Sequence, residues 1–471
     1  MHLLLSTLFL TVACLLSTSP QAIAQAPAPT TQWDKTFGGS DLDGLEALQQ
    51  TSDGGYILGG GTNSGISGDK TQGNQGSGDY WIVKLDANGI KQWDKTFGGS
   101  DQEYFTALQQ TTDGGYILGG RSSSSIGGDK TQPSQGEVDY WVVKLDANGA
   151  KQWDKTFGGN NLDNLLALQQ TSDGGYMLGG QSNSGISGDK TQGNQGEFDY
   201  WVVKLDASGT KQWDKTFGGR NMDGLEALQQ TSDGGYILGG FSNSDISGDK
   251  TQGNQGSQGG YDYWVIKLDA NGTTQWDKTF GGNKLDGLNA LQQTSDGGYI
   301  LGGWSDSDSS GDKTQASQGY GDYWVVKLDA NGIKQWDKTF GGSDLDNLTG
   351  LQQTRDGGYI LGGESYSDNS GDKTQGNQGR SDYWVVKLGA LPLATTSATP
   401  RPTLCAYPNP TRTQFTLRGP LGTPYQLLDQ FGHIVRLGQV SAQPLDVQTL
   451  PAGLYLLRDT SSGRTSKLMK E

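Results

Sequence analysis

The chain has 471 residues, of which 76 are Gly, 32% are apolar and 18% are charged, and its net charge is −16. The chain has no long charge-dense helical stretch, which argues against a coiled coil or helix bundle, and its 13 Trp and 19 Tyr supply too much buried ring surface for a disordered chain. No Cys or His lies between residues 25 and 400, which excludes a disulfide scaffold, structural zinc and Ser-His-Asp chemistry from most of the sequence.

Residues 1–24 have the pattern of a secretory signal peptide. The apolar core Leu8–Leu16 is too short to span a bilayer, and Ala22-Ile23-Ala24 forms a small-x-small cleavage site. A lipoprotein signal through Cys14 and a buried N-terminal helix are the alternatives. No later run of 18 apolar residues exists, so we expect no transmembrane helix in the mature protein, and residues 25–31 are interpreted as a short linker.

Six copies of one unit dominate the chain and define a repeat array over residues 32–388. Gln-Trp-Asp-Lys-Thr-Phe-Gly-Gly occurs six times, with its Trp at positions 33, 93, 153, 213, 276 and 336. Asp-Tyr-Trp follows the same period, with its Trp at 81, 141, 201, 264, 324 and 384. A fixed period of about 60 residues is typical of propellers and other repeat architectures.

Each unit contains four strand-like runs, which in the first unit are Ala47–Thr51, Tyr56–Gly60, Tyr80–Asp86 and Lys91–Phe97. Asp-Gly joins the first pair of runs and Asn-Gly joins the last pair, and both dipeptides favour the primed turns of tight hairpins. A long polar connection joins the two hairpins. Six repeats of four antiparallel strands predict an all-β fold, namely a six-bladed β-propeller of four-stranded blades.

The phase of the array predicts how the ring closes. The array begins with the fourth run of a unit, Gln32–Phe37, and ends with the third run, Tyr383–Leu388. We therefore expect the N-terminal strand to pair beside Tyr383–Leu388 and complete the last blade. Such closure would leave no open strand edge.

The motifs of the unit are similar to the repeats of secreted bacterial propeller-like proteins. Gly-Gly-Tyr-Ile-Leu-Gly-Gly, then Asp-Tyr-Trp-Val-Val-Lys-Leu-Asp and a later Trp, carry this resemblance, and they loosely resemble kelch repeats. The resemblance implies the blade fold and no activity. Some kelch-like propellers are copper oxidases with His, Tyr and Cys ligands, but an array without His or Cys does not carry that activity over.

The sequence after the array changes in character. Residues 389–403 are rich in Pro, Thr and Ala and are interpreted as an extended linker. Residues 404–471 show short alternating strands between Pro and Gly turns, which predicts a small β-sandwich. The array and everything before residue 401 carry a net charge of −20, whereas residues 401–471 carry +4.

The order of motifs in residues 404–471 resembles the C-terminal sorting domain of the type IX secretion system of Bacteroidetes. The matching motifs are Tyr407-Pro408-Asn409-Pro410, Phe415-Thr416-Leu417 and Pro451-Ala452-Gly453-Leu454-Tyr455, and Cys405 is a departure from the family. The resemblance implies export through the type IX machinery as a partner, and a cell-surface or extracellular location. An ordinary Ig-like accessory domain is the alternative.

Comparison of the six units with one another locates a candidate ligand site. The residue after Leu-Gly-Gly differs in every unit, and the loop after Phe-Gly-Gly also varies. In an up-and-down blade both variable regions emerge on one face of the disc, and the invariant turns emerge on the other. Simple drift of exposed loops is the alternative explanation. The predicted ligand contacts are Tyr104, Arg121, Phe241 and Trp304, because aromatic and Arg side chains stack on sugars or peptides.

An acidic residue recurs near the start of every unit. Asp41-x-Asp43-Gly44 hints at a Ca²⁺ loop, but such a loop needs six to eight oxygens and a downstream bidentate Glu that is missing. We interpret the recurring acid as a turn cap and expect no cofactor. Its positions are Asp43, Glu103, Asp163, Asp223, Asp286 and Asp346.

Three functions fit the sequence. The first is a secreted, surface-displayed, non-catalytic propeller that binds glycan or protein, and it is expected to be a monomer that repels nucleic acid. The second is a carboxylate-based polysaccharide hydrolase, which needs two acids about 5–10 Å apart. The third is a purely structural surface protein. Candidate acids for the hydrolase are Glu46, Glu137, Glu197, Glu226 and Glu364.

Overall fold

The computed structural model describes residues 32–256, 260–389, 404–460 and 465–471. The predicted signal peptide, the first linker and all of the second linker except Gly389 lie outside the described residues. Regular structure in the described part is entirely β-strand, and no helix there is long and apolar enough to cross a membrane. The chain divides into two compact units, with the boundary after Leu388.

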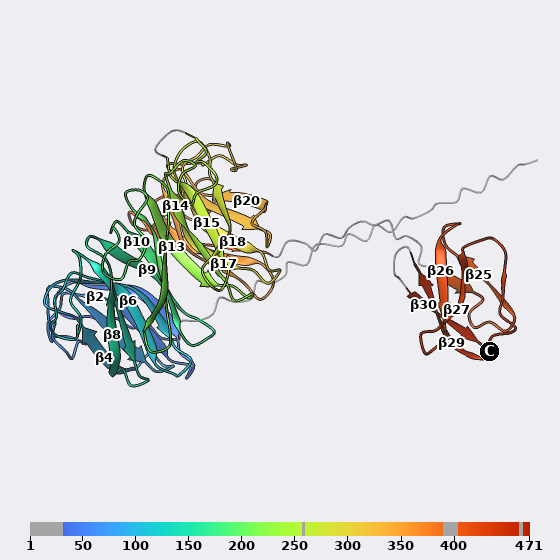
Figure 1. Ribbon diagram of the computed structural model, residues 1–471, viewed down its shortest axis with the longest axis horizontal. Helices are drawn as coiled ribbons and strands as arrows, with labels where there is room; N and C mark the ends of the chain where they lie inside the picture. The colour runs from blue at the N-terminus through green and yellow to red at the C-terminus, as the bar shows by residue number, and fades with distance from the viewer. Residues whose placement is uncertain (1–31, 257–259, 390–403, 461–464) are drawn as a thin grey trace, which may run out of the picture. The chain divides into compact units, whose positions relative to one another are not determined.

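The first unit holds six antiparallel sheets built to one plan (Figure 1). Sheets 1 to 3 comprise β1 (Asp43–Gln50), β2 (Tyr56–Thr62), β3 (Asp79–Leu85), β4 (Lys91–Phe97), β5 (Glu103–Gln110), β6 (Tyr116–Ser122), β7 (Asp139–Leu145), β8 (Lys151–Phe157), β9 (Asp163–Gln170), β10 (Tyr176–Ser182), β11 (Asp199–Leu205) and β12 (Lys211–Phe217). Sheets 4 to 6 comprise β13 (Asp223–Gln230), β14 (Tyr236–Ser242), β15 (Asp262–Leu268), β16 (Thr274–Phe280), β17 (Asp286–Gln293), β18 (Tyr299–Ser305), β19 (Asp322–Leu328), β20 (Lys334–Phe340), β21 (Asp346–Gln353), β22 (Tyr359–Ser365) and β23 (Asp382–Leu388). These repeated sheets confirm the predicted all-β class and are consistent with the blades of a β-propeller.

The tight turns differ from the predicted primed type. A type I′ turn needs positive φ at both central residues, and in the described residues only glycines have positive φ. The turn after β1 has a Gly54 N–H bond to the Thr51 carbonyl (2.9 Å), and Gly54 alone takes φ of 82°. The Asp53 carboxylate accepts the Gly55 N–H (3.0 Å) and so stabilises a wider turn that ends in one left-handed glycine.

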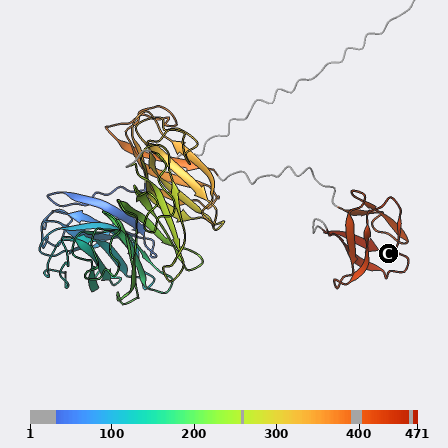
Figure 2. The same ribbon diagram turned by 45° about the horizontal axis from the view of Figure 1, so that its top comes forward.

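Burial of both faces of the third strand explains how the sheets stack. The first strand of each sheet lies against the first three strands of the preceding sheet, so β5 contacts β1, β2 and β3. Every residue of β3, β7, β11, β15 and β19 is buried. One apolar cluster fills each junction, for example Tyr80 and Ile82 of sheet 1 with Phe105, Leu118 and Trp141 of sheet 2. Figures 1 and 2 show the sheets following one another in chain order.

The expected pairing of the N-terminal strand with the last sheet is absent from this structure. Among the residues that the structure describes, sheet 6 contains three strands, and β23 pairs with β22 alone. Residues 32–37 form no strand, and they lie on sheet 1, where Phe37 packs against Trp81, Val83 and Leu85. The prediction failed because a covering strand makes two separate contacts: it packs on one sheet and pairs with the edge of another. Residues 32–37 pack on sheet 1 but do not pair with sheet 6.

The second unit has two sheets around one core, in agreement with the predicted small sandwich. Its strands are β24 (Cys405–Tyr407), β25 (Gln414–Arg418), β26 (Pro424–Leu428), β27 (Ile434–Gln439), β28 (Leu445–Asp446), β29 (Gly453–Asp459) and β30 (Thr465–Lys470). The sheets have the strand orders β24-β25-β28 and β27-β26-β29-β30. Phe415, Leu427, Leu457 and Leu468 are almost wholly buried between them.

Candidate functional site

The variable residue of each repeat occupies one position of the second strand and faces a residue of the first strand. We call these six cross-strand pairs the variable row. The pairs are Gly44–Gly61, Tyr104–Arg121, Asn164–Gln181, Gly224–Phe241, Gly287–Trp304 and Asn347–Glu364. Because residues directly opposite each other in a sheet are near neighbours, two members of a pair that both carry side chains can contact each other.

Tyr104 and Arg121 contact each other, as their shared position suggests. The Arg121 guanidinium lies 4.6 Å from the centre of the Tyr104 ring, and Tyr104 remains 43% exposed. Arg121 Nη1 also donates to Asn164 Oδ1 of the next sheet at 3.0 Å. The pair therefore presents an aromatic face and a positioned cation at one junction between sheets.

Phe241 on β14 and Trp304 on β18 lie in two different sheets, and neither sheet is the one that carries Tyr104 and Arg121. Each covers the glycine opposite it, because a side-chain carbon added to Gly224 would lie 2.4 Å from Phe241 and one added to Gly287 would lie 2.6 Å from Trp304. Phe241 also meets Tyr261 edge to face, with the ring centres 5.1 Å apart. The four predicted contacts thus form a spaced series and not one pocket.

A cavity of about 210 Å³ opens where both members of a pair are glycine. Its lining includes Gly44 and Gly61 from sheet 1, and Gln102, Glu103 and Tyr104 from sheet 2. The missing side chains of the glycine pair leave space beside the exposed Tyr104 ring. This cavity therefore adjoins the variable row at the junction of sheets 1 and 2.

The loops that carry sequence variation meet at the end of the sheets nearest the variable row. The Asn63 N–H, from the loop after β2, donates to the Leu42 carbonyl at 2.9 Å. Asp69 N–H donates to the Gly38 carbonyl at 2.9 Å. The second-to-third and fourth-to-first connections therefore lie together, as the blade argument predicts.

The recurring acid at the start of each first strand caps the preceding turn, as predicted. Asp43 Oδ2 accepts the Gly39 N–H at 2.7 Å and the Ser64 hydroxyl at 2.9 Å. Glu103 accepts the Gly99 N–H at Oε2 (2.8 Å) and the hydroxyls of Ser124 (2.5 Å) and Ser122 (2.7 Å) at Oε1. In the described ranges, no group of three or more His, Cys, Asp or Glu is arranged to hold a metal ion.

Every repeat also contains a buried lysine that was not predicted from the sequence. Lys190 is 1% exposed and donates to Ser182 Oγ at 2.9 Å and to Asn194 Oδ1 at 2.5 Å. Burial lowers the pKa of Lys190 to about 8, and burial raises the pKa of Asp199 nearby to about 7. The invariant Gly-Asp-Lys-Thr-Gln of the long loop was the available signal, since that loop folds inward around the lysine.

The hairpin turns carry an exposed acid whose ionised form is favoured by folding. In sheet 3, burial alone would raise the pKa of Asp173, but bonds from Thr171 (2.5 Å), Lys204 (3.1 Å) and Gly175 (3.0 Å) outweigh burial and lower it to about 2. The pKa of the equivalent acids is also lowered to about 2. They are Asp53, Asp233 and Asp296.

We expect Asp173→Asn to destabilise the protein at pH 5 but not at pH 2. The folded pKa lies below the ordinary value of 3.8, so the carboxylate contributes stability above about pH 4 and loses it as the pH falls toward 2. Urea unfolding of both proteins at pH 5, 4, 3 and 2 measures the difference. A difference that stays constant over this range would contradict the assignment.

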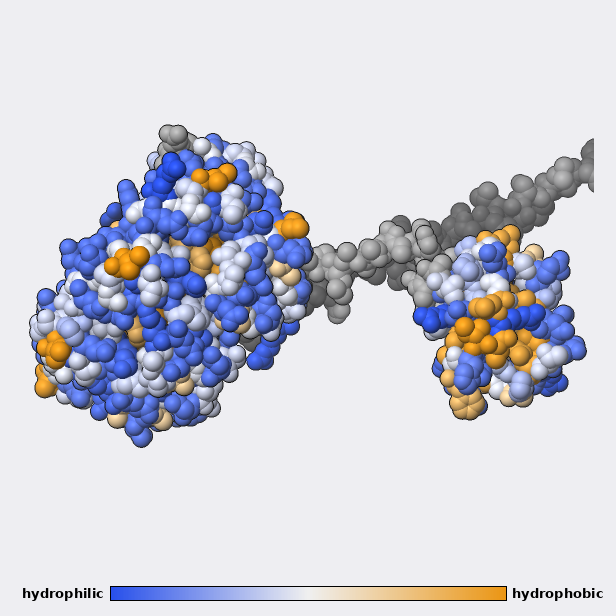
Figure 3. Space-filling model, viewed as in Figure 1, coloured by the Kyte–Doolittle hydropathy of each residue, from blue (hydrophilic) through white to orange (hydrophobic). Residues whose placement is uncertain are grey.

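The second unit exposes an apolar patch on the sheet that contains β27. Figure 3 shows apolar residues gathered on the visible face of this unit. Ile434 is 50% exposed and Leu437 is 65% exposed, both on β27, and Phe431 in the preceding turn is 76% exposed. Patches of this kind on soluble domains mark sites of interaction with other proteins or membranes.

The family comparison decides what this second unit is. Residues 405–471 match the model of the secretion system C-terminal sorting domain. Residues 405–471 are a sorting domain. The domain directs the protein through type IX secretion to the cell surface or the extracellular space, and it implies contact with the secretion machinery.

Comparisons with whole proteins show only low similarity. A stretch of 149 residues, 31% of this chain, is 28% identical to the regulatory protein FlaEY of Caulobacter vibrioides and covers 15% of it. PorZ, a surface component of the type IX secretion system of Porphyromonas gingivalis, matches 93% of this chain and 53% of its own, with 12% identity and a TM-score of 0.36. A protein of unknown function from Dyadobacter fermentans matches 75% of this chain and 97% of its own, with 11% identity and a TM-score of 0.40.

Proposed function

We propose that the six-sheet unit is a non-catalytic binding module for glycans, displayed at the cell surface by the sorting domain. The observation that carries the proposal is the variable row. Near-identical repeats differ most clearly at this one structural position, and there they place an Arg, a Phe, a Trp, a Gln and a Glu on otherwise equivalent strands.

The chemistry of the row favours a sugar ligand. Aromatic rings provide flat apolar faces, and Arg, Asn and Gln side chains provide planar hydrogen-bonding groups beside them. The exposed Tyr104 ring lines the cavity of about 210 Å³ between sheets 1 and 2, and the Arg121 guanidinium lies 4.6 Å from the centre of that ring while it bonds to sheet 3. The negative net charge of the chain disfavours nucleic acid as the ligand.

The position of the acids supports binding over hydrolysis. Glu46 and Glu103 line the same cavity, but both Glu103 oxygens accept hydrogen bonds from Gly99, Ser122 and Ser124. Burial raises the pKa of Glu226 to about 7, yet Glu226 does not line that cavity. Glu364 bonds to Ser381 at 2.6 Å. No second free carboxylate accompanies Glu46 among the described lining residues, as glycoside hydrolysis would require.

A glycan array probed with the purified full chain tests the proposed function. We expect Arg121→Ala and Trp304→Ala each to weaken binding about 5- to 100-fold, the range of interface hot spots. Arg355→Ala is the matched control, because Arg355 is exposed in the turn between β21 and β22, at the other end of the sheet from the row. Unchanged affinity in both row variants would contradict the site, and release of reducing ends from a polysaccharide would favour the hydrolase. Inertness in both screens would favour a structural role.

A further inference from the structure

The buried lysine of sheet 3 contacts the side-chain amide of a residue in its own loop. Lys190 Nζ lies 2.5 Å from Asn194 Oδ1. Because a C=O bond is about 1.2 Å long, the Asn194 Cγ atom lies within about 3.7 Å of that nitrogen. Reacting atoms in a productive arrangement are about 3–3.5 Å apart. An amine and an amide carbon are therefore held close to reaction distance.

The Asn194 amide is fixed in one orientation. Its Nδ2 donates to the Ser182 carbonyl at 2.5 Å and to the Glu197 carbonyl at 3.3 Å. Lys190 Nζ also donates to Ser182 Oγ at 2.9 Å, and the lysine is 1% exposed. Both groups are thus oriented before any reaction, which removes most of the entropic cost of bringing them together.

A buried carboxyl group lies beside this pair. Asp199 has no exposed surface, and its Oδ2 accepts the N–H of Gln195, the residue after Asn194, at 2.6 Å. Its Oδ1 is buried and has no hydrogen-bond partner among the described residues. Burial raises the pKa of Asp199 to about 7 and lowers the pKa of Lys190 to about 8. Near neutral pH some molecules therefore hold an uncharged amine nucleophile beside a protonated carboxyl.

Sheet 4 repeats this arrangement. Lys250 Nζ lies 2.6 Å from Asn254 Oδ1. Asn254 Nδ2 donates to the carbonyls of Ser242 and Gly260, each at 2.7 Å. Asp262 is 1% exposed, and burial raises its pKa to about 8. Burial also lowers the pKa of Lys250 to about 8, so the same three groups meet in the same state.

Sheets 2 and 5 have the lysine but lack the amide. Ser134 and Ser317 stand where the other repeats have Asn. Their hydroxyls accept hydrogen bonds from Lys130 at 3.2 Å and from Lys313 at 2.7 Å. Because a hydroxyl has no carbonyl carbon, a lysine cannot be acylated there. These two sheets also show that the loop folds without the amide.

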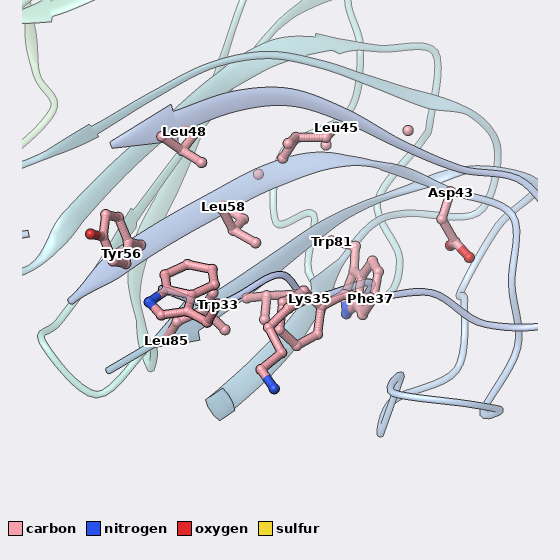
Figure 4. A pocket seen from close by; sticks show the side chains of 14 residues that line it. Trp33, Lys35, Phe37, Asp43, Leu45, Leu48, Tyr56, Leu58, Trp81 and Leu85 are labelled. Atoms are coloured by element: carbon pink, nitrogen blue, oxygen red, sulfur yellow. The ribbon is translucent and has the colours of Figure 1, made fainter. Parts of the chain in front are cut away.

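The loop of sheet 3 is also held by the sheet before it. Gln135 of sheet 2 donates to Asp189, the residue before Lys190. Within the described residues no sheet precedes sheet 1. The face that such a sheet would cover is an open pocket of about 250 Å³, lined in part by Leu45 and Trp81 (Figure 4). The loop of sheet 1 therefore lacks this support.

The arrangement is incomplete in the two end sheets. In sheet 1, Asn74 Oδ1 is buried without a partner, and Lys70 donates elsewhere in the loop. In sheet 6, Lys373 donates to Asn377 Oδ1, but Asp382 is half-buried. The fully buried form of the arrangement thus occurs in sheets 3 and 4.

We propose that Lys190 and Asn194 join spontaneously through an isopeptide bond, as do Lys250 and Asn254. The uncharged Lys190 Nζ attacks Asn194 Cγ, the Nζ–Cγ bond forms and the Cγ–Nδ2 bond breaks. The Asp199 carboxyl takes one proton from Nζ and gives one to Nδ2, which leaves as ammonia. The step is neither an oxidation nor a reduction, and it needs no co-reactant.

These bonds fix the long loops that follow the variable row. Ser182, whose carbonyl holds the Asn194 amide, directly follows Gln181 of the row. Secreted proteins commonly gain covalent reinforcement from disulfides, but no Cys lies between residues 25 and 400. An amide made from Lys and Asn supplies such reinforcement without an oxidant.

Tryptic peptides of the unaltered, purified full chain test the proposal. After denaturation, trypsin cleaves at free lysines but not at a lysine whose amine is part of an amide. We expect Lys190 and Lys250 each to remain uncleaved, in a peptide that is lighter by one ammonia. Lys130, whose neighbour is Ser134, is the internal control and is cleaved normally. Cleavage at Lys190 and Lys250 as complete as at Lys130 would overturn the proposal.

Two variants exclude other ways of losing ammonia, such as cyclisation of Asn194 on the backbone. Lys190→Arg keeps the charge and the amide, and Asn194→Ser copies the residue found in sheets 2 and 5. We expect each variant to restore the full mass of the peptide that contains residue 194. The ammonia lost at Lys250 serves as the control in the same sample and stays lost. Persistent loss around residue 194 in Lys190→Arg would contradict the lysine's role.

Discussion

A chain that ends at residue 403 is expected to be absent from the cell surface, whereas the full chain reaches it. The truncation removes the whole sorting domain, which residues 405–471 form around a single core. Without it the type IX machinery has nothing to recognise, and the six-sheet unit is retained inside the cell envelope. Protease added to intact cells measures the exposed fraction, which we expect to fall from most of the protein to background.

Two point variants separate recognition from folding of the sorting domain. Leu427→Asp places a charge in the core, where Leu427 has no exposed surface. We expect this variant to lose surface display as the truncated chain does. Leu437→Ser alters the exposed patch on β27 and leaves the core intact. We expect it to reduce export without unfolding the domain. Normal surface display of the truncated chain would refute the role of residues 405–471.

Trp201→Ala is expected to lower the free energy of unfolding by about 3–5 kcal/mol, which is the usual cost of removing a large buried ring. Trp201 has no exposed surface and fills the junction between sheets 2 and 3, with its ring 4.8 Å from that of Tyr140. Its indole N–H also donates to Asp214 at 3.2 Å, so the variant leaves a buried acceptor with one bond fewer. Urea unfolding at neutral pH measures the change.

The matched control for this substitution is Ile186→Ala. Ile186 is 74% exposed in the long loop of the same repeat, so its truncation should change stability by less than about 0.5 kcal/mol. A similar decrease in the free energy of unfolding for Trp201→Ala and Ile186→Ala would show that the junctions between sheets do not stabilise the unit.

The sequence predicted the strands well because their signals are local and repeated. β4 matches the predicted run, and β3 begins one residue before it. Only β1 begins well before its predicted run, at Asp43, because the glycine that follows interrupts the apolar pattern. The turns were predicted wrongly, since dipeptide preference alone does not reveal that the Asp53 side chain bonds to the Gly55 N–H.

Features that depend on contacts between sheets could not be read from the sequence. The position of the variable row followed from comparing repeats, but the Arg121–Asn164 bond joins two sheets and needs their relative placement. The burial of Lys190 likewise depends on how a polar loop folds over its own sheet. Ring closure was predicted from the phase of the repeats, but residues 32–37 form no strand beside β23, because such a pairing depends on long-range geometry that no local pattern encodes.

The most direct test of the account is a hydrogen-exchange footprint of the full chain with the tightest-binding oligosaccharide of the array. The account predicts slower amide exchange on binding in β5, β6 and β18, around Tyr104, Arg121 and Trp304. It predicts no change in the invariant hairpin turns at the other end of the sheets. A footprint confined to those turns or to residues 405–471 would contradict the claim that the variable row is the ligand site.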